Sequence, residues 1–576
     1  MNTIKLPLEH TTSINNCDMY YTTGAAYDTE STTIYNDDKT VKIAFVYHVQ
    51  FAIGTSYYTF RTLNDFCIFL KQLVDYLHDV SNDENEPKLI IWVCNMSHEY
   101  AFIKNYLNDF NITKIFGKTR RQPLLIEIGN VIQFREAIGL WGHSAKDISD
   151  NWCEQYKKLT GDLDYELIRH SLTDIEKNDS GHSEYDYMKN DVLLLTEMHN
   201  HIFREYINEN GSIYIPYTVS GLVRLHLKDA AINDESLTEF RERCFSKIDS
   251  NITVLKIMNK NIFTNSDDWN LLRTYGFSGG VVGTNRVHVG HVRQHVKCAD
   301  IESDYPYQML SKQYPCGKIH VGHEREWKNA LNEHKPVFAL IAIEKLTAKT
   351  EHAFISKHKI VNDNSEIYAT RHGNSRNTLI YNGKIVQAEN VLLVVNDVDY
   401  SIYSDAYDMK NVVCLKCWYF DRYGRLPVWL RKCVAMDYYT KTIIKRKYGK
   451  KAQTMISYRD AKSRVNTYFG TLALRPSDVF DSIDDSDYLL KPDHELTFDE
   501  MVKNTWLNPY WAFYITSYAR KMLIENIIYR PNCVIQYDTD SIYYISNTND
   551  GRELEKHLRE FNDNCRHMTF KKLVKR

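Results

Sequence analysis

The sequence predicts a multidomain protein of the α/β and α+β classes, and three observations lead to this prediction. The chain has 576 residues, too many for one hydrophobic core and enough for about three or four structural units. In roughly the first 200 residues, strand-like apolar runs alternate with helical spacing, as in an α/β domain. From about residue 211 the pattern is less regular, with separate aromatic and basic tracts.

The elements of the N-terminal unit follow from apolar periodicity. Residues 42–53 and 88–93 are apolar runs that predict strands, and the helical spacing of apolar residues over 65–78 predicts a helix. The polar stretch 174–184 precedes a further expected helix, which closes this unit.

Composition narrows the function classes. The chain is 43% apolar and 25% charged, as in ordinary folded proteins, and its net charge of −3 gives no chain-wide basic field for nucleic acid, although local basic stripes remain open. Twelve cysteines without a signal peptide indicate reduced thiols and a cytoplasmic location. The sequence lacks an apolar run of about 18 residues, so no membrane span is expected. The 41 tyrosines suit stacking on bases and ordinary sheets equally.

Two acidic residues share one face of an expected strand in the N-terminal unit. Asp28 and Glu30 lie in the sequence YDTEST, and residues i and i+2 of a strand point to the same side. Their carboxylates could hold hard divalent cations through oxygen. Taken alone, the pattern favours two surface acids on an edge strand.

Further acids and a tyrosine follow in an order that allows a common site. Glu99 comes just past the apolar run 90–93, at a strand end where the sites of α/β proteins gather. Tyr187 and Asp191 lie four residues apart in an expected helix and share a face. Each alone could be a solvated residue. Together they predict a two-metal phosphodiester hydrolysis site, in which the phenol orients a water.

A second set of acids lies in the C-terminal unit. Asp300 ends an expected strand and is followed by Tyr305 at a proline turn. Residues 534–544 predict two strands with Asp538 and Asp540 at the tip of the turn. Like carboxylates raise each other's pKa, and bound Mg²⁺ would remove that cost. A polar hairpin turn is the alternative, and the pattern alone leaves the two about even.

A helix expected over residues 462–470 places Lys462, Asn466 and Phe469 on one face. The cation could hold a triphosphate, and the ring could pack on a base. Upstream lies a basic run that could contact a phosphate backbone or form a solvated helix face. This run consists of Lys441, Lys445, Arg446, Lys447, Lys450 and Lys451.

Taken in order along the chain, the acidic motifs of the N-terminal unit resemble the exonuclease motifs of family-B DNA polymerases, most closely the protein-primed subgroup of phages and linear plasmids. Asp28 and Glu30 match DxE, residues 95–99 match the second motif with Glu99 where aspartate is frequent, and Tyr187 with Asp191 matches YxxxD. Residues 158–165 resemble a segment with an auxiliary lysine. Thr160 falls at its place, which leaves Lys158 as a secondary candidate.

The polymerase motifs of the same family follow. Residues 277–280 (FSGG) resemble the YxGG linker between the two activities, and residues 511–520 resemble the helix before the last motif. Three palm motifs match those of the family apart from single substitutions within them. These are DxxSLYP at 300–306 with Asp304 for leucine, KxxxNSxYG at 462–470 with Phe469 for tyrosine, and YxDTDS at 536–541 with Gln536 for tyrosine.

The resemblance implies a ribonuclease-H-like 3′→5′ exonuclease domain at 1–205 and a right-hand polymerase domain at 206–576. The chain ends soon after Asp540, so the thumb is expected to be truncated or missing. In relatives, two insertions grip the priming protein and encircle the template. The expected parts are the palm at 206–390 and 500–576, an insertion at about 391–434, the fingers at about 435–475 and a smaller insertion at about 476–497.

The resemblance also implies a DNA-directed DNA polymerase that adds dNMPs to a 3′-hydroxyl by two-metal phosphoryl transfer. Asp300 and Asp540 would bind two Mg²⁺ ions, with Asp538 in support. Lys462 would hold the triphosphate, and Tyr305 would exclude a 2′-hydroxyl. Asn466 and Phe469 would shape the pocket of the nascent base pair.

In the exonuclease domain, Asp28, Glu30, Glu99 and Asp191 would bind two more Mg²⁺ ions, which Mn²⁺ could replace, and Tyr187 would orient the water. The two glycines of the linker would let the backbone approach DNA closely. The expected DNA contacts are Asn95, Gly279, Gly280, Lys445, Arg446 and Lys447.

The implied partners are template–primer DNA, dNTPs, a terminal protein primer and a single-stranded DNA-binding protein, with no membrane. Such an enzyme would replicate a linear phage or plasmid genome, in the host cytoplasm if it is phage-encoded. The alternative is a thumb-less nucleic-acid-binding protein that retains only 3′→5′ exonuclease activity. Primer extension discriminates between the two.

Overall fold

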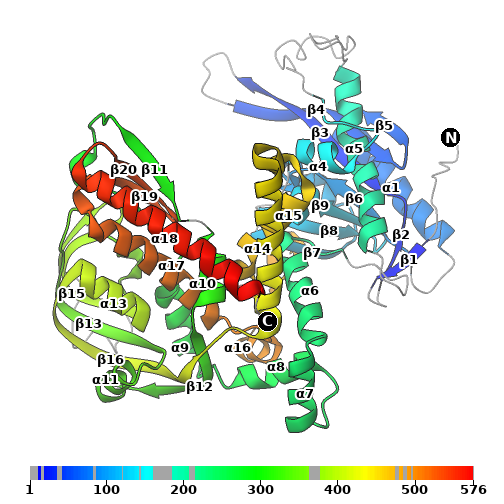
Figure 1. Ribbon diagram of the computed structural model, residues 1–576. Coiled ribbons are helices and arrows are strands. Elements are labelled where there is room, and N and C mark those ends of the chain that lie inside the picture. Colours follow the sequence, from blue (N-terminus) through cyan, green and yellow to red (C-terminus); the bar gives the residue numbers. More distant parts are fainter. Residues whose placement is uncertain are drawn as a thin grey trace. The chain divides into compact units, whose positions relative to one another are not determined.

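The computed structural model divides the chain into two compact units, which are described separately (Figure 1). Unit 1 comprises Met1–Val223, Lys451–Ile456 and Arg475–Leu496, and the rest of the chain forms unit 2. Apart from Glu184, the polar stretch 174–184 lies outside the described residues. The structure describes residues 11–14, 18–35, 42–81, 86–119, 121–141, 144–159, 184–206, 215–301, 303–361, 376–473, 479–483, 490–494 and 497–574.

Unit 1 is built on a nine-stranded sheet of order β18-β17-β7-β8-β9-β6-β3-β4-β5. β6 pairs in parallel with β3 and with β9, and it is buried at every position, as expected of a central parallel strand. The predictions of strands at 42–53 and 88–93 are confirmed by β4 and β6. The strands are β3 (Ala25–Tyr35), β4 (Lys42–Ile53), β5 (Ser56–Phe60), β6 (Leu89–Val93), β7 (Ile112–Thr119), β8 (Gln122–Ile128), β9 (Ile132–Glu136), β17 (Val479–Ile483) and β18 (Leu490–His494), beside a separate pair, β1 (Thr11–Ile14) and β2 (Asp18–Tyr21).

Helices cover both faces of this sheet, because successive side chains of a strand alternate between its faces. Tyr27 and Phe51 pack in one core with residues of α1 and α2, while Ala26 and Trp92 pack in another with residues of α5. Asp28 and Glu30 follow Ala26 to the α5 face. The helix predicted at 65–78 is confirmed as α1. The helices are α1 (Leu63–Val80), α2 (Met96–Leu107), α3 (Ala137–Trp141), α4 (Ala145–Trp152) and α5 (Glu184–Tyr206).

Unit 2 contains a four-stranded antiparallel sheet of order β10-β19-β20-β11. Helices α17 and α18 lie beside this sheet (Figure 1). Leu523 and Leu558 of these helices belong to one buried core with Ile542 and Tyr544 of β20. The opposite face stays open and carries exposed acids. The elements are β10 (Val282–Thr284), β11 (Val296–Asp300), β19 (Val534–Asp538), β20 (Ser541–Ile545), α10 (Asp304–Ser311), α17 (Tyr510–Tyr529) and α18 (Asn549–Val574).

A second sheet of unit 2, of order β12-β16-β13-β15-β14, changes the position of the expected insertion at 391–434. Val391 lies inside β15 and Val434 inside α14, so neither expected boundary falls between elements. Strands β15 and β16, which overlap the expected insertion, both pair with the earlier strand β13. The sheet therefore begins well before residue 391, at β12. Motif spacing gives the length of an insertion but not its strand pairing. The elements are β12 (Tyr314–Gly322), β13 (Val337–Ala348), β14 (Arg376–Tyr381), β15 (Lys384–Asn396), α13 (Asp397–Ala406) and β16 (Tyr407–Gly424).

The segment expected as fingers forms two helices, α14 (Val428–Tyr448) and α15 (Ile456–Leu472), joined by the turn η5 (Gly449–Thr454). Asp437 ties them together, since it pairs with Arg464 at 2.8 Å and accepts a hydrogen bond from the Tyr468 hydroxyl at 2.6 Å. The remaining helices named here are α6 (Val219–Ile232), α7 (Glu235–Cys244), α8 (Asn251–Lys260), α9 (Ser266–Leu271), η2 (Leu272–Gly276), α11 (Glu324–Asn332), η4 (Lys357–Lys359) and α16 (Phe498–Asn504).

The smaller insertion expected at about 476–497 is a β-hairpin of unit 1. β17 pairs with β18 and also with β7, through Val479 with Phe116 and Phe480 with Ile115. The sequence placed this segment in the polymerase domain, because strand pairing over such a separation leaves no local pattern. The first boundary between the units falls after Val223, later than the expected residue 205.

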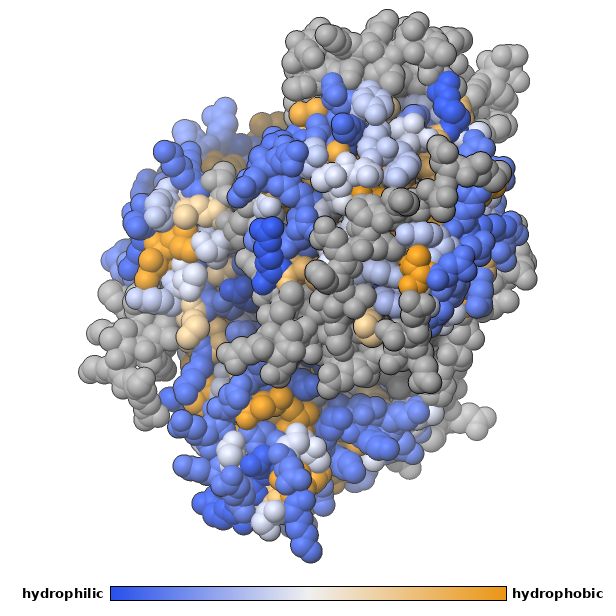
Figure 2. All heavy atoms as spheres, turned by 90° about the vertical axis from the view of Figure 1, so that its right-hand side faces the viewer, coloured by the Kyte–Doolittle hydropathy of each residue, from blue (hydrophilic) through white to orange (hydrophobic). Residues whose placement is uncertain are grey.

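Within the described ranges, no helix combines the length and apolar content that a bilayer crossing requires. On the face drawn in Figure 2, hydrophilic residues predominate and apolar residues form small separate groups.

Candidate functional site

Three carboxylates converge in unit 1. Asp28 and Glu30 extend from β3 and Asp191 from α5, and one ligand oxygen of each lies within 4.8 Å of the others. This arrangement agrees with the expectation that residues i and i+2 of the strand face one side. Three carboxylate oxygens at this separation fit the ligand preference of a hard divalent cation.

Burial disfavours the ionised form of these three carboxylates. It raises the pKa of Asp28 well above its usual range, with Glu99, Glu30 and Asp191 adding to the rise. Burial, aided by Asp191, also raises the pKa of Glu30 to about 7. The pKa of Asp191 is raised by burial as well, although Lys158 opposes this rise. A divalent cation would supply the missing positive charge.

Lys158 lies at this cluster. Its ammonium donates a hydrogen bond to the Tyr187 hydroxyl at 2.7 Å and forms an ion pair with Asp191. Burial lowers the pKa of Lys158, but Asp191 and Tyr187 outweigh this effect and raise it. The structure thus brings Tyr187 and Asp191 together on one face of α5, and the secondary candidate of the sequence is the lysine that contacts them.

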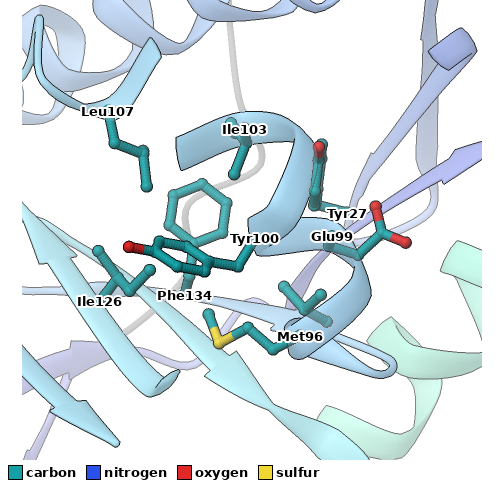
Figure 3. A pocket seen from close by; sticks show the side chains of 9 residues that line it. Tyr27, Met96, Glu99, Tyr100, Ile103, Leu107, Ile126 and Phe134 are labelled. Atoms are coloured by element: carbon teal, nitrogen blue, oxygen red, sulfur yellow. The ribbon is translucent and has the colours of Figure 1, made fainter. Parts of the chain in front are cut away.

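Glu99 lies beside the three ligands rather than among them. It is 3% exposed in the first turn of α2, and its Oε2 accepts a hydrogen bond from the Thr29 hydroxyl at 2.5 Å. Its Oε1 lies 3.0 Å from Nδ1 of His98. Figure 3 shows its carboxylate pointing away from the small apolar pocket formed with Tyr100 and Phe134. Its charge is the largest electrostatic contribution to the raised pKa of Asp28.

Asn95 precedes α2 in a left-handed conformation, with φ 60° and ψ 59°, and it is exposed. Its side chain does not cap the helix, so it remains available at the surface. Glu136, a residue that sequence reasoning missed, holds this turn by accepting the main-chain N–H groups of Asn95 and Met96.

The acids of unit 2 gather at the open ends of β11, β19 and β20. Asp300 pairs with Ser541 in the sheet, and the Ile301 amide donates to the Asp540 carbonyl at 2.6 Å. The turn between Asp538 and Asp540 contains Thr539 in a left-handed conformation, with φ 56°. Distant segments therefore place Asp300 next to the hairpin tip, as expected.

Partial burial raises the pKa of Asp540, and Asp300 adds to this rise. Among the residues that the structure describes, the acids of unit 2 do not bring three ligand atoms within 4.8 Å of one another. Asp540, with its raised pKa and Asp300 beside it, nevertheless forms a site that divalent cations would stabilise.

A cavity of about 840 Å³ opens next to these acids, within the size range of small-molecule and cofactor sites. Its wall combines anionic, cationic and aromatic side chains, and it includes Lys462 and Asn466 of α15. The polar and aromatic lining consists of Asp300, Ser303, Asp304, Tyr305, Tyr438, Lys441, Thr442, Lys445, Arg446, Tyr458, Lys462, Asn466, Thr539, Asp540 and Asn562.

Tyr305 lines this cavity and packs on Phe469, which is not part of the lining, with ring centroids 4.3 Å apart and planes inclined by 37°. Asp304, which stands where the resembled motif has leucine, is 4% exposed, and burial raises its pKa to about 7. Its Oδ1 accepts a hydrogen bond from the Gln308 amide at 2.6 Å, while its Oδ2 has no partner.

The expected DNA-binding residues separate into two groups. Lys445 and Arg446 line the cavity, whereas Lys447 is exposed at the end of α14 with its ammonium 5.0 Å from the Tyr448 ring centroid. At Gly280 a Cβ atom would come within 2.6 Å of Thr539, while at Gly279 it would meet nothing within 4 Å. The absence of a side chain at Gly280 is therefore required by the protein's own hairpin, a reason that the sequence motif did not give.

The family model of DNA polymerase type B, organellar and viral, matches residues 148–556. The chain belongs to this family. Comparison with curated proteins gave no match.

Solved structures of phi29 DNA polymerase share the fold of this type B polymerase. They include its complexes with primer-template DNA and incoming nucleotide (TM-score 0.55, 18% identity), with primer-template DNA (0.59, 18%) and with single-stranded DNA (0.60, 16%). Each match covers 91% of this chain and 80% of the phi29 chain. The expectation of a multidomain family-B polymerase fold is confirmed.

Lys441 and Asn562 also line the cavity of this type B polymerase, although the sequence predicted no role in the polymerase site for either of them. The Lys441 ammonium lies 3.1 Å from the Ser303 hydroxyl and belongs to the basic run, which was its only signal. Asn562 of α18 donates a hydrogen bond to the Asp300 carbonyl at 2.8 Å, and no sequence pattern indicated it.

Proposed function

We propose that this type B polymerase adds dNMPs to a 3′-hydroxyl on a DNA template and removes mispaired ends with a 3′→5′ exonuclease. One observation carries the first activity. Asp300 and Asp540, brought together from distant segments, line one cavity with Lys462 and Tyr305. Nucleotidyl transfer requires acids that bind the metal cations, a cationic side chain that binds the phosphates and a ring that contacts the sugar.

The proposal gives roles to residues in and next to this cavity. Asp300 and Asp540 hold two Mg²⁺ ions, with Asp538 in support and Mn²⁺ as a substitute, and the ions supply charge neutralisation at the reacting phosphate. Lys462, exposed on α15, binds the triphosphate. Tyr305 lies under the sugar and excludes a 2′-hydroxyl. Phe469, packed on Tyr305, and Asn466 shape the space for the new base pair.

The carboxylates of unit 1 support the nuclease activity. Asp28, Glu30 and Asp191 hold two Mg²⁺ ions, Glu99 supports them, and Tyr187 orients the attacking water while Lys158 fixes its hydroxyl. The central strand order β5-β4-β3-β6-β9, with β3, β6 and β9 parallel, supports the proposal of a ribonuclease-H-like domain. Asn95, exposed at the start of α2, contacts the single strand.

We further propose duplex contacts by Lys445, Arg446, Lys447 and the linker of Gly279 and Gly280, and initiation on a terminal protein. The extra five-stranded sheet of unit 2 precedes Lys462 in the chain and is the segment that we assign to the priming protein. A terminal protein would become labelled by a radioactive dNTP in the presence of the polymerase, and an unlabelled protein would remove this assignment.

Primer extension tests the main proposal. A 5′-labelled primer on a longer template should lengthen with Mg²⁺ and dNTPs, and the single strand should shorten without dNTPs. Asp540→Asn should abolish lengthening and spare shortening, whereas Asp191→Asn should do the reverse. Shortening without lengthening in the wild type would instead support a chain with nuclease activity alone.

A sugar-selection assay tests Tyr305. Tyr305→Ala should raise the ratio of ribonucleotide to deoxyribonucleotide incorporation by about tenfold or more, because the side chain that meets the 2′-hydroxyl is gone. Tyr307→Ala, on the same helix but outside the cavity lining, is the control. Unchanged sugar selection would remove the assignment of Tyr305.

A further inference from the structure

Two cations bind main-chain carbonyls of η2 and of the segment that leads from it to β10. The Lys359 ammonium donates hydrogen bonds to the Thr274 carbonyl at 3.0 Å and to the Phe277 carbonyl. The Arg520 guanidinium donates to the Gly279 carbonyl at 2.8 Å and to the Ser278 carbonyl. Irregular backbone needs such partners, and here they are charged side chains rather than a neighbouring strand.

Arg520 is rigidly held. It is 1% exposed, pairs with Asp399 at 2.6 Å and also donates to the Ser517 hydroxyl at 2.8 Å. A guanidinium buried to this extent cannot reach a DNA phosphate. Arg520 therefore acts on the active site through its hydrogen bonds to the linker carbonyls.

The other end of the linker holds the turn that carries the acids. The Val281 carbonyl accepts a hydrogen bond from the Thr539 amide at 2.9 Å, and Val282 pairs with Asp538 in the sheet. Gly280 lies directly against Thr539, where a Cβ would approach within 2.6 Å. A displacement of the linker would thus move the turn between Asp538 and Asp540.

Keeping Lys359 charged beside Arg520 has a cost. Burial and the charge of Arg520 lower the pKa of Lys359 to about 8, while Asp399 opposes this shift. Lysines with a strongly lowered pKa concentrate at functional sites. A neutral side chain of similar shape would avoid the cost if the position only filled space.

We propose that Lys359, together with Arg520, is a positioning residue for nucleotide addition: the two cations fix the linker carbonyls and, through Gly280 and Val281, the turn that bears Asp538 and Asp540. This inference rests on the proposed polymerase activity. It assigns a task to Lys359, which lies far along the chain from every polymerase motif.

Single-nucleotide incorporation by Lys359→Met and Lys359→Arg tests this role. Lys359→Met should lower kcat by about tenfold or more, since small misplacements of reacting groups are costly, and should raise the Mg²⁺ concentration needed for half-maximal rate. The KM for dNTP should stay within about twofold. Lys359→Arg, which keeps a cation with several donors, should recover most of the lost rate.

Two readouts separate positioning from a general structural role. Single-strand digestion and the unfolding midpoint of Lys359→Met should match the wild type. Lys357→Met, in the same turn η4 and exposed, is the matched control and should leave all rates unchanged. An unchanged kcat, failure of arginine to rescue, or parallel losses of extension, digestion and stability would each overturn the inference. A wild-type chain that extends no primer would overturn the proposed function as well.

Discussion

Oε2 of Glu136 accepts a hydrogen bond from the main-chain amide of Met96 at 2.6 Å. Its Oε1 accepts the Asn95 amide at 3.2 Å and the Ile138 amide at 2.9 Å. Burial raises the pKa of Glu136, and these amides oppose the rise. One carboxylate at the end of β9 thereby fixes the starts of α2 and α3.

Glu136→Gln should weaken digestion of single strands by about tenfold, because an amide NH₂ would face backbone donors and loosen α2, which carries Glu99. Losing bonds to a buried charged acceptor should also cost about 2–3 kcal/mol of stability. Digestion rate and the first unfolding transition are the measurements. Asp79→Ala, exposed on α1, is the control, and unaltered digestion by Glu136→Gln would contradict this assignment.

Removal of Lys158 should shift the pH dependence of digestion. Burial raises the pKa of Glu30 to about 7, and Lys158 opposes that rise, so Lys158→Met should raise it further. Fewer carboxylates are then ionised at neutral pH. We expect a loss of about tenfold to a hundredfold at pH 7 and a higher half-maximal pH.

Initial rates of digestion between about pH 6 and 9 at a fixed, subsaturating Mg²⁺ concentration check this shift, because saturating metal would itself displace the proton. Lys158→Arg should keep the wild-type profile, because the cation remains. Lys146→Met, exposed on α4, serves as the control. The assignment of Lys158 fails if the methionine variant shows an unmoved half-maximal pH.

Two adjacent glycines should differ sharply when replaced by alanine. Gly280→Ala forces a Cβ against Thr539 at 2.6 Å, whereas Gly279→Ala meets no atom within 4 Å. Extension should therefore fall by about tenfold or more in the first variant and much less in the second. Equal losses in the two variants would contradict the importance given to the contact between Gly280 and Thr539.

Asp304→Asn should stabilise unit 2 at alkaline pH. The folded protein holds a proton on Asp304 up to about pH 7, so the stability from this group falls as pH rises from about 4 to 7. A shift of about three units corresponds to at most roughly 4 kcal/mol. Replacement by asparagine removes this loss.

Asp304→Asn should therefore raise the unfolding midpoint more at pH 8 than at pH 5, with EDTA present in both measurements. Asp267→Asn, exposed on α9, should show no such difference. An equal gain at both pH values would mean that Asp304 is ionised without a penalty.

Local patterns predicted the elements that carry the acids. The DxE spacing of Asp28 and Glu30 on β3, the helix of Tyr187 and Asp191, and the hairpin of Asp538 and Asp540 all depend on residues near in sequence. Periodicity and turn chemistry act at that range.

Contacts between residues far apart in the sequence could not be predicted in this way. Glu136 binds a helix start 40 residues earlier, and Lys359 binds a carbonyl 82 residues earlier. The pairing of β17 with β7 and the start of the five-stranded sheet at β12 likewise depend on the folded chain. Neither an amide-binding carboxylate nor a carbonyl-binding lysine has a sequence signature.

The pairing of β17 with β7 also bears on how the two proposed activities could be separated. A fragment that stops at Val223 would lack β17 and β18, which return to the sheet of unit 1 from residues 475–496. Its β7 edge would be uncovered, and bare sheet edges recruit other chains and aggregate. An isolated nuclease would therefore need the hairpin grafted back through a short connector, rather than a single cut of the gene.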